Sequence, residues 1–341
     1  MDKKTYYNNL TVSSSPHLVT ALDTQKTMMM VLIALDPSLV MSVVVFGIRP
    51  IILTAVCMAA SAFFEYAYNK LMKKTSTVQD LSACVTGAIL AMNLPSNFPY
   101  WMAIIGCFTA IVVVKGIYGG LGRNIANPAI VGRIVLLLSF TTQMTTWPVP
   151  KQAASDAVTG PTPLALVAGG ASKSDLSEIA KGKPGTLPSN MDLFLGYVGG
   201  SMGEVSAVAI LIGGAFLIWK KIISPIIPVS FIASVFLFAL AYYGIKGGDY
   251  NAVQMAVFHV CAGGVMFGAF FCATDYVTSP IMNKGRLIFG IGCGVITMVI
   301  RIWCNYPEGV SFAILFMNMM TPLIDKVVIK RTYGGAKKNE K

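Results

Sequence analysis

The chain has 341 residues, of which 55% are hydrophobic and only 12% are charged, about half the charged fraction of a soluble domain. Its mean hydropathy of +0.67 and its long apolar runs exclude an ordinary soluble protein and predict an integral membrane protein built of helices. The net charge of +11 would suggest a nucleic-acid partner in a soluble protein, but Lys and Arg collect in the cytoplasmic loops of membrane proteins. We therefore expect a lipid bilayer as partner and no nucleic acid.

Ten apolar runs predict ten transmembrane helices in chain order. The polar segment from Met1 to Lys26 precedes the first run and lacks the pattern of a cleavable signal peptide. The third run is shorter than the ~20 residues of a full crossing and ends at Asn93-Leu94-Pro95, which predicts a short or broken helix. The predicted spans cover residues 28–46, 49–70, 80–94, 98–117, 126–142, 203–221, 226–245, 252–273, 286–304 and 308–326.

The distribution of basic residues predicts the orientation of these spans. With the N-terminus in the cytoplasm, 19 of the 26 Lys and Arg residues fall in inside segments and inner span ends, and 7 fall outside. Because basic residues concentrate on the cytoplasmic side, both termini are predicted to be cytoplasmic. We expect a multi-pass protein of the bacterial or archaeal inner (plasma) membrane. Its polar, proline-rich stretch from about Thr145 to Asp192 would lie on the outer side.

Two of the spans share a pattern that suggests an internal repeat. The third span is rich in small residues over 87–92, the eighth is rich in them over 264–271, and each runs into a turn sequence. Two tandem units of five spans would be inverted relative to each other, with binding sites near their interface. Coincidence between two glycine-containing helices explains the similarity equally well. The predicted organisation is an all-α integral membrane protein with a first repeat over 1–142, an outer loop over 143–202 and a second repeat over 203–341.

We single out five charged or histidine residues inside the predicted spans, where such groups are functional candidates by default. Asp36 lies in mid-span directly before Pro37. It is a candidate for ion handling, for pairing with a basic residue, or for contact with another protein of a complex. Glu65 is close to Lys70 and the inner face, which favours pairing or snorkelling. His259 has no second histidine nearby in the sequence, so we expect a hydrogen-bonded core residue there and no metal site. The five residues are Asp36, Glu65, Arg133, His259 and Arg301.

The chain lacks the motifs of several common redox sites. Its seven cysteines lie in or at the edges of apolar runs and form no CxxC pair, which predicts packing residues. A cluster site shared with a neighbouring protein is the alternative. No Rossmann GxGxxG, P-loop or CxxC…CxxC pattern occurs in a suitable context. We therefore expect no catalytic residue, no metal site, and no nicotinamide or ferredoxin site on this chain.

The outer loop contains a sequence that resembles a known modification motif. It reads Ser-Asp-Ala-Val-Thr-Gly-Pro-Thr-Pro-Leu over 155–164, which is similar to the flavinylation motif Asp-x-x-Ser/Thr-Gly-Ala-Thr of the RnfD/NqrB family. The resemblance implies FMN joined through its phosphate to the hydroxyl of Thr162 by a separate flavin transferase. Asp156, Thr159 and Gly160 are the other motif residues, and a proline replaces the usual alanine. An exposed loop would let the transferase reach the hydroxyl, and an ordinary Pro/Thr loop is the alternative.

The resemblance extends over nearly the whole chain. Ser-Pro-His at 15–17, the first span over 32–37 and the turn over 118–129 all look like the corresponding family segments. Family members bind a second flavin, riboflavin, without a covalent bond, and Asn124 and Asn127 match positions that contact it. Their amides suit the donor and acceptor edge of an isoalloxazine ring. The family also tends to have an apolar residue where this chain has Asp36.

The flavin candidates have structural explanations as well. The two asparagines precede Pro128, where a helix-capping residue is typical, and both roles are compatible. Gly87 in the third span is a further riboflavin candidate, because a glycine lets a flat ring approach the backbone closely. Helix packing is the alternative explanation for Gly87.

By resemblance, the chain is most similar to the RnfD proteins of Rnf-type complexes, which pass electrons between ferredoxin and NAD and couple this to Na+ or H+ transport. Its partners would be the other proteins of such a membrane complex. The NqrB protein of the Na+-pumping NADH:quinone reductase is the alternative within the family, although it carries a longer segment before its first span than the about 26 residues here. A channel of urea-transporter type is the alternative from another class. A colourless purified protein would favour that channel over a flavoprotein.

Overall fold

The computed structural model is mostly helical. Its described residues are 23–74, 77–148, 159–160, 162–168, 190–196, 198–246, 251–304 and 308–328.

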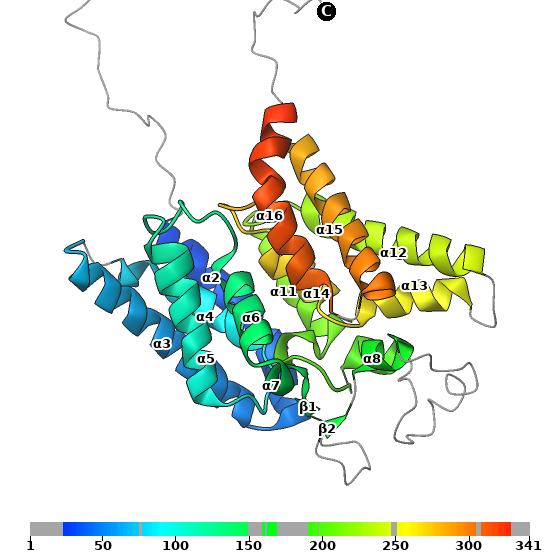
Figure 1. Ribbon diagram of the computed structural model, residues 1–341, viewed down its shortest axis with the longest axis horizontal. Helices are drawn as coiled ribbons and strands as arrows, with labels where there is room; N and C mark the ends of the chain where they lie inside the picture. The colour runs from blue at the N-terminus through cyan, green and yellow to red at the C-terminus, as the bar shows by residue number, and fades with distance from the viewer. Residues whose placement is uncertain are drawn as a thin grey trace, which may run out of the picture.

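The first half of the described chain forms one group of helices, drawn from blue to green in Figure 1. The Asp23 carboxylate caps the first of them by accepting a hydrogen bond from the amide of Thr24, and Pro50 occupies the first turn of the second, where proline is tolerated. The elements are α2 (Thr24–Phe46), α3 (Arg49–Leu71), η1 (Val78–Asp80), α4 (Ser82–Met92), α5 (Tyr100–Phe108), its π-helical continuation η2 (Thr109–Gly116), α6 (Pro128–Ser139) and α7 (Thr141–Thr145).

The second half forms another group, drawn from light green to red, which lies beside the first (Figure 1). Short elements connect the two groups, including an antiparallel pair of two-residue strands in which Trp147 lies opposite Gly160 and Pro148 opposite Thr159. The elements are β1 (Trp147–Pro148), β2 (Thr159–Gly160), α8 (Pro163–Ala168), α10 (Asn190–Leu195), η4 (Met202–Glu204), α11 (Ala207–Trp219), α12 (Ile226–Lys246), α13 (Ala252–Cys261), α14 (Val265–Phe267), the π-helical η5 (Gly268–Cys272), α15 (Asn283–Trp303) and α16 (Val310–Val327).

Helices occupy all ten ranges that the sequence predicts as spans. Among the described residues, α2, α3, α12, α15 and α16 are long and apolar enough to cross a membrane. The bent pair of α13 with α14 and η5 passes the same test together, as a broken span or a re-entrant loop. The other four apolar helices have 10–17 residues, fewer than the ~20 of a full crossing. A helical, multi-pass membrane protein is therefore confirmed, whereas the number of ten crossings and the inverted repeat stay predictions.

The sharpest break falls in the eighth range, where the helix bends by 59° between α13 and α14. Gly263 and Gly264 make this bend with φ angles of 57° and 45°, which glycine adopts without a Cβ clash. Such a break leaves backbone carbonyls without helical partners, which is costly at membrane depth. The Arg301 guanidinium of α15 donates to the carbonyls of His259 (2.6 Å), Ala262 (2.9 Å) and Gly263. Arg301 therefore replaces the missing helical donors.

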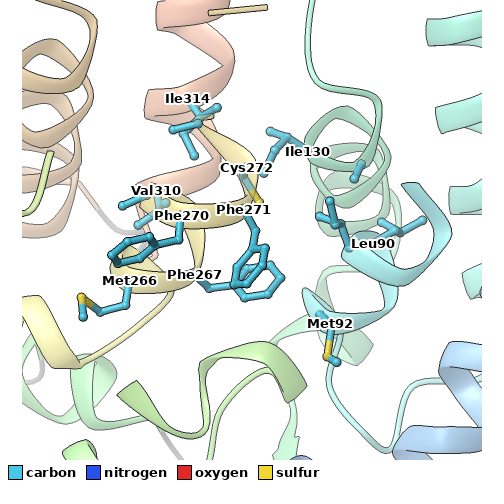
Figure 2. Close-up of a cluster of buried hydrophobic side chains, with 14 of the residues drawn as sticks. Leu90, Met92, Ile130, Met266, Phe267, Phe270, Phe271, Cys272, Val310 and Ile314 are labelled. Carbon is cyan, nitrogen blue, oxygen red and sulfur yellow. The ribbon is translucent and has the colours of Figure 1, made fainter. Parts of the chain in front are cut away.

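One hydrophobic core joins the two groups of helices. Figure 2 shows its centre, with Phe267, Phe270 and Phe271 of α14 and η5 on one side and Leu90 of α4 and Ile130 of α6 on the other. All five side chains are buried. The two groups therefore share their interior, and a side chain of one can complete a site on the other.

Two glycines let helices approach more closely than any other residue would allow. A Cβ at Gly213 of α11 would lie 2.1 Å from the carbonyl oxygen of Ala34 in α2, and a Cβ at Gly87 of α4 would lie 2.6 Å from the carbonyl oxygen of Cys57 in α3. Small residues at such crossings are typical of membrane helix pairs. The packing explanation of Gly87 is thus confirmed, and a contact with flavin stays a prediction.

Candidate functional site

A cleft between the two groups of helices contains both asparagines that the sequence singles out. Its empty volume is about 780 Å³, including the part open to the surroundings, and Asn124 and Asn127 both line it. We call it the Asn124 cleft. Most of its wall is apolar and comes from α2, α4, α11 and η5. Its polar lining consists of Ser82, Thr86, Lys115, Asn124, Asn127, Thr274, Asp275 and Tyr276.

A glycine-rich turn brings the two asparagines to this cleft. The turn leads from η2 to α6, and Gly119, Gly120 and Gly122 adopt φ angles of 115°, 99° and 88°. Residues with a Cβ rarely adopt such angles. The glycines therefore allow the tight turn that precedes α6 and that contains Asn124 and Asn127.

Asn127 forms a hydrogen bond between the two groups of helices. Its Oδ1 accepts hydrogen bonds from the amides of Ala129 (3.0 Å) and Ile130 (3.4 Å), which caps α6. Its Nδ2 donates to the carbonyl oxygen of Cys272 in η5 at 3.0 Å. The capping role that its position before Pro128 predicts is confirmed. Because both ends of the amide are occupied, Asn127 orients the cleft wall.

Asn124 is buried beside a carboxylic acid that the sequence did not single out. Its Nδ2 donates to the carbonyl oxygen of Ala126 at 3.1 Å, and its side chain is hydrogen-bonded to Asp275. Burial raises the pKa of Asp275, and hydrogen bonds from Val277, Thr278 and Asn124 oppose part of that rise. The Asn124 cleft is therefore lined by an acid that holds a proton more readily than an exposed aspartate. The only sign of Asp275 in the sequence was its position in a turn.

Lys115, which forms a buried ion pair with Glu65, is another part of the cleft wall. The Lys115 ammonium lies 2.7 Å from Glu65 Oε1 and donates to Ser82 Oγ at 2.8 Å. Thr77 Oγ1 also donates to Glu65 Oε1, at 2.8 Å. Pairing of Glu65 is thus confirmed, with Lys115 as its partner, whereas the sequence pointed to the neighbouring Lys70. Both charges are compensated, so Lys115 can line an otherwise apolar cleft.

Thr162 lies in a second, smaller cleft. Its side chain is buried, with 5% exposed, and its Oγ1 accepts a hydrogen bond from the amide of Ala165 at 3.2 Å, at the start of α8. This corrects the expectation that Thr162 is exposed, because the neighbouring Leu164 packs into a local apolar cluster. Thr159 and Gly160 form β2, and Asp156 lies outside the described residues.

A cluster of buried and partly buried charges lies beside Thr162. Glu204 and Glu308 line the same cleft as the threonine. The Arg133 guanidinium of α6 forms a short ion pair with Glu308 and lies 3.7 Å from Glu204. It also donates to the side chains of Asn93 (3.1 Å) and Ser311 (2.9 Å). We call Arg133, Glu204 and Glu308 the Arg133 cluster. It joins α4, α6, η4 and the start of α16, and thereby both groups of helices.

A family model for NQR2, RnfD and RnfE matches residues 11–334. The chain belongs to this family. It is 45% identical over 332 residues, 96% of both chains, to the D subunit of the Na+-translocating ferredoxin:NAD+ oxidoreductase complex of Acetobacterium woodii. It is 43% identical over 331 residues, 96% of this chain and 97% of the relative, to the D subunit of the proton-translocating ferredoxin:NAD+ oxidoreductase complex of Clostridium ljungdahlii. The D subunit of an ion-translocating oxidoreductase complex of Ectopseudomonas mendocina is 37% identical over 332 residues, 96% of both chains.

Membership of the RnfD/NqrB family confirms the resemblance drawn from the motifs.

His259 and Asp36, which the sequence also singled out, lie in different surroundings from each other. His259 is buried, stacks on Tyr243 and lies 3.0 Å from its hydroxyl, as expected for a core histidine. In the described part of the chain, no three His, Cys, Asp or Glu side chains come together in a group that could hold a metal. Asp36 is exposed on α2, away from both clefts.

Sequence reasoning missed four polar residues of these sites. Lys115 lies within an apolar span, and Glu204 and Glu308 each adjoin a glycine at the start of one. A charge in such a position is the signal that would have found them. Asp275 carries a weaker signal, because it lies in the turn sequence that follows the eighth span.

Proposed function

We propose that this chain is the D-type member of an ion-translocating ferredoxin:NAD+ oxidoreductase complex and that it holds two flavins. The observation that carries the proposal is its end-to-end similarity to the D subunits of such complexes, at 45% and 43% identity. The partners are the other proteins of that complex. A bound flavin would supply one- and two-electron transfer, and the chain would bind and orient the flavins within the membrane.

The Asn124 cleft is the proposed site of the noncovalent riboflavin. Its empty space of about 780 Å³ includes the part open to the surroundings, and the cavity itself measures about 100 Å³, less than the roughly 300–1,000 Å³ of small-molecule sites, so the ring would extend into the open part of the cleft. An isoalloxazine ring has an apolar edge and a polar edge, and the cleft combines an apolar wall with Asn124, Lys115 and Asp275. We propose that Asn124 and Lys115 hold the polar edge, while Asn127 fixes the wall. The apolar wall would exclude water from the ring.

Thr162 is the proposed attachment point of a covalent FMN. A threonine hydroxyl can form the phosphoester, and the motif resemblance favours the last threonine of the segment. The unmodified hydroxyl is buried and is hydrogen-bonded to the amide of Ala165. We therefore propose that the flavin transferase acts before α8 packs against its neighbours. Glu204 and Glu308 line the same cleft and would oppose a phosphate at this position, and the guanidinium of Arg133, which pairs with both carboxylates, would reduce that cost.

The finer topology also belongs to the proposal. Helices in all ten predicted ranges support ten segments, which we assign to two inverted units of five. The broken eighth span and the short α4 are typical of the discontinuous helices found at repeat interfaces. The distribution of basic residues, 19 inside and 7 outside, supports cytoplasmic termini and an outer position for the Thr162 loop. With FMN on the outer side and riboflavin near the inner side, the chain would carry electrons across most of the membrane.

Fluorescence of the denatured chain in a gel tests the covalent flavin. Wild-type protein should fluoresce, and Thr162→Ala should not, because the phosphoester requires a hydroxyl. Thr162→Ser is the matched control, since it keeps both the hydroxyl and the acceptor for Ala165, and it should retain fluorescence. Thr159→Ala should retain at least part of the signal. A fluorescent Thr162→Ala chain would contradict the assignment, and a colourless wild-type protein would favour the urea-transporter-like channel.

Extraction of noncovalent flavin tests the Asn124 cleft. Asn124→Leu should lower extractable riboflavin and leave covalent FMN fluorescence intact. The structure makes Asn127→Leu a different probe, because this variant also removes the α6 cap and the hydrogen bond to Cys272. We expect it to lower both riboflavin and the melting temperature. Unchanged riboflavin in the folded Asn124→Leu, Asn127→Leu double variant would refute the site.

A further inference from the structure

The middle of α2 presents a carboxylate to the outside of the protein. Asp36 is residue 13 of the 23 in α2, so it lies near the midpoint of a helix long enough to cross the membrane. Its side chain is exposed. Within the described part of the chain, no hydrogen bond or ion pair joins the carboxylate to another residue.

The position of Asp36 follows from how α2 packs. Gly213 of α11 lies against the carbonyl of Ala34, which turns one face of α2 toward the protein interior. At 3.6 residues per turn, the buried and the exposed residues of α2 fall on opposite faces. Over residues 28–46 of α2, the buried set is Ala34, Leu35, Ser38, Ser42 and Val45, and the exposed set is Met29, Ile33, Asp36, Val40 and Val44.

A second polar group lies on the same exposed face. Pro37 is inside α2 and has no amide hydrogen, so the carbonyl of Ile33, four residues earlier, lacks the donor that another residue would supply. Ile33 is itself 49% exposed. A carboxylate and an unsatisfied backbone acceptor therefore occur together near the middle of the bilayer. Lipid tails offer no hydrogen bond to either group.

We propose that this exposed face of α2 is the docking surface for a transmembrane helix of another protein of the complex, and that this helix carries a Lys or Arg side chain at the depth of Asp36. Charge complementarity argues for a basic residue, and its several N–H groups could serve both the carboxylate and the Ile33 carbonyl. The apolar residues above and below Asp36 would pack against the same helix. The inference rests on the proposed membership of a multi-protein complex.

Recovery of the partner proteins tests the docking surface. The complex would be purified from membranes through a tag on this chain, and its components quantified by mass spectrometry. Asp36→Leu should lower recovery of the docking partner by roughly tenfold or more, because the partner's cation would lose its counter-charge at a buried contact. Asp36→Glu should restore much of that recovery. Leu237→Ala is the control, since Leu237 is 60% exposed near the middle of α12, and it should leave recovery unchanged.

A photoreactive residue at Val40 would identify the partner. We expect a cross-link to a transmembrane segment of another protein of the complex that contains Lys or Arg, and replacing that basic residue with Asp should restore recovery with Asp36→Arg. Normal recovery with Asp36→Leu would overturn the proposal, as would cross-links only to lipid, to a second copy of this chain or to a segment without a basic residue. Gel fluorescence of the same Asp36→Leu chain reports covalent flavin, so a failure of docking is distinguished from a failure of the proposed function.

Discussion

Replacing Arg133 with leucine would remove the cation that holds the Arg133 cluster together. The guanidinium is buried, pairs with Glu308, faces Glu204 at 3.7 Å and donates to Asn93 and Ser311. Leucine keeps an apolar side chain of high helix propensity in α6, so the change acts mainly on these contacts. Two carboxylates would then lie at the interface of the two groups of helices without their nearest cation.

The expected cost follows from these contacts. Breaking a buried ion pair by removing one partner costs about 3–5 kcal/mol, because the other charge stays buried. The acceptors on Asn93 and Ser311 would also lose a donor, but contacts made by one side chain do not add in full. We therefore expect Arg133→Leu to lower the free energy of unfolding by about 3–5 kcal/mol. For a chain of 341 residues, an unfolding entropy of about 2.1 cal/mol/K per residue converts this into a loss of roughly 4–7 °C in Tm.

Thermal unfolding in detergent, followed by tryptophan fluorescence at a fixed scan rate, measures this loss. The double variant Arg133→Leu, Glu308→Leu is the matched control, because replacing both partners of a buried pair with apolar residues is often nearly neutral. It should recover at least part of the stability that the single variant loses. A single variant within about 2 °C of wild type, or a double variant that loses the full sum of the two single effects, would refute an energetic role for the pair.

Three further predictions concern packing, topology and the buried ion pair. Gly213→Ala should lower Tm, since overpacking costs about 1–3 kcal/mol. Gly244→Ala is the control, because a Cβ there meets no atom within 4 Å, and it should leave Tm unchanged or raise it. Equal effects of the two substitutions on Tm would refute the close approach of α11 to α2. A cysteine in place of Lys173 should react with an impermeant thiol reagent in intact cells, and labelling only after the membrane is broken would overturn the outer position of this loop. Lys115→Met should lower both Tm and extractable riboflavin. The double variant Lys115→Met, Glu65→Gln should recover the Tm. A Tm unchanged by Lys115→Met would contradict a stabilising role for this ion pair.

The sequence by itself determined which segments are helical and to which family the chain belongs. At membrane depth the backbone must satisfy its own hydrogen bonds, so an apolar run such as 226–245 implies a helix, and α12 covers this range. Local rules also determined the ends, as with Asn127 and Pro128 at the start of α6. The motif segments over 118–129 and 155–164 were specific enough to indicate the family before any other comparison.

Only the tertiary structure decided which way the charges in the spans point and what they contact. An apolar run fixes the depth of a residue but not the face on which it lies, so only the packing exposed Asp36 and paired Glu65 with Lys115 instead of the Lys70 nearby in the sequence. Arg133 meets Glu308 across 175 residues of sequence, a contact that no local pattern encodes. The burial of Thr162 has the same origin, because it depends on long-range packing of α8 and not on the polarity of its loop.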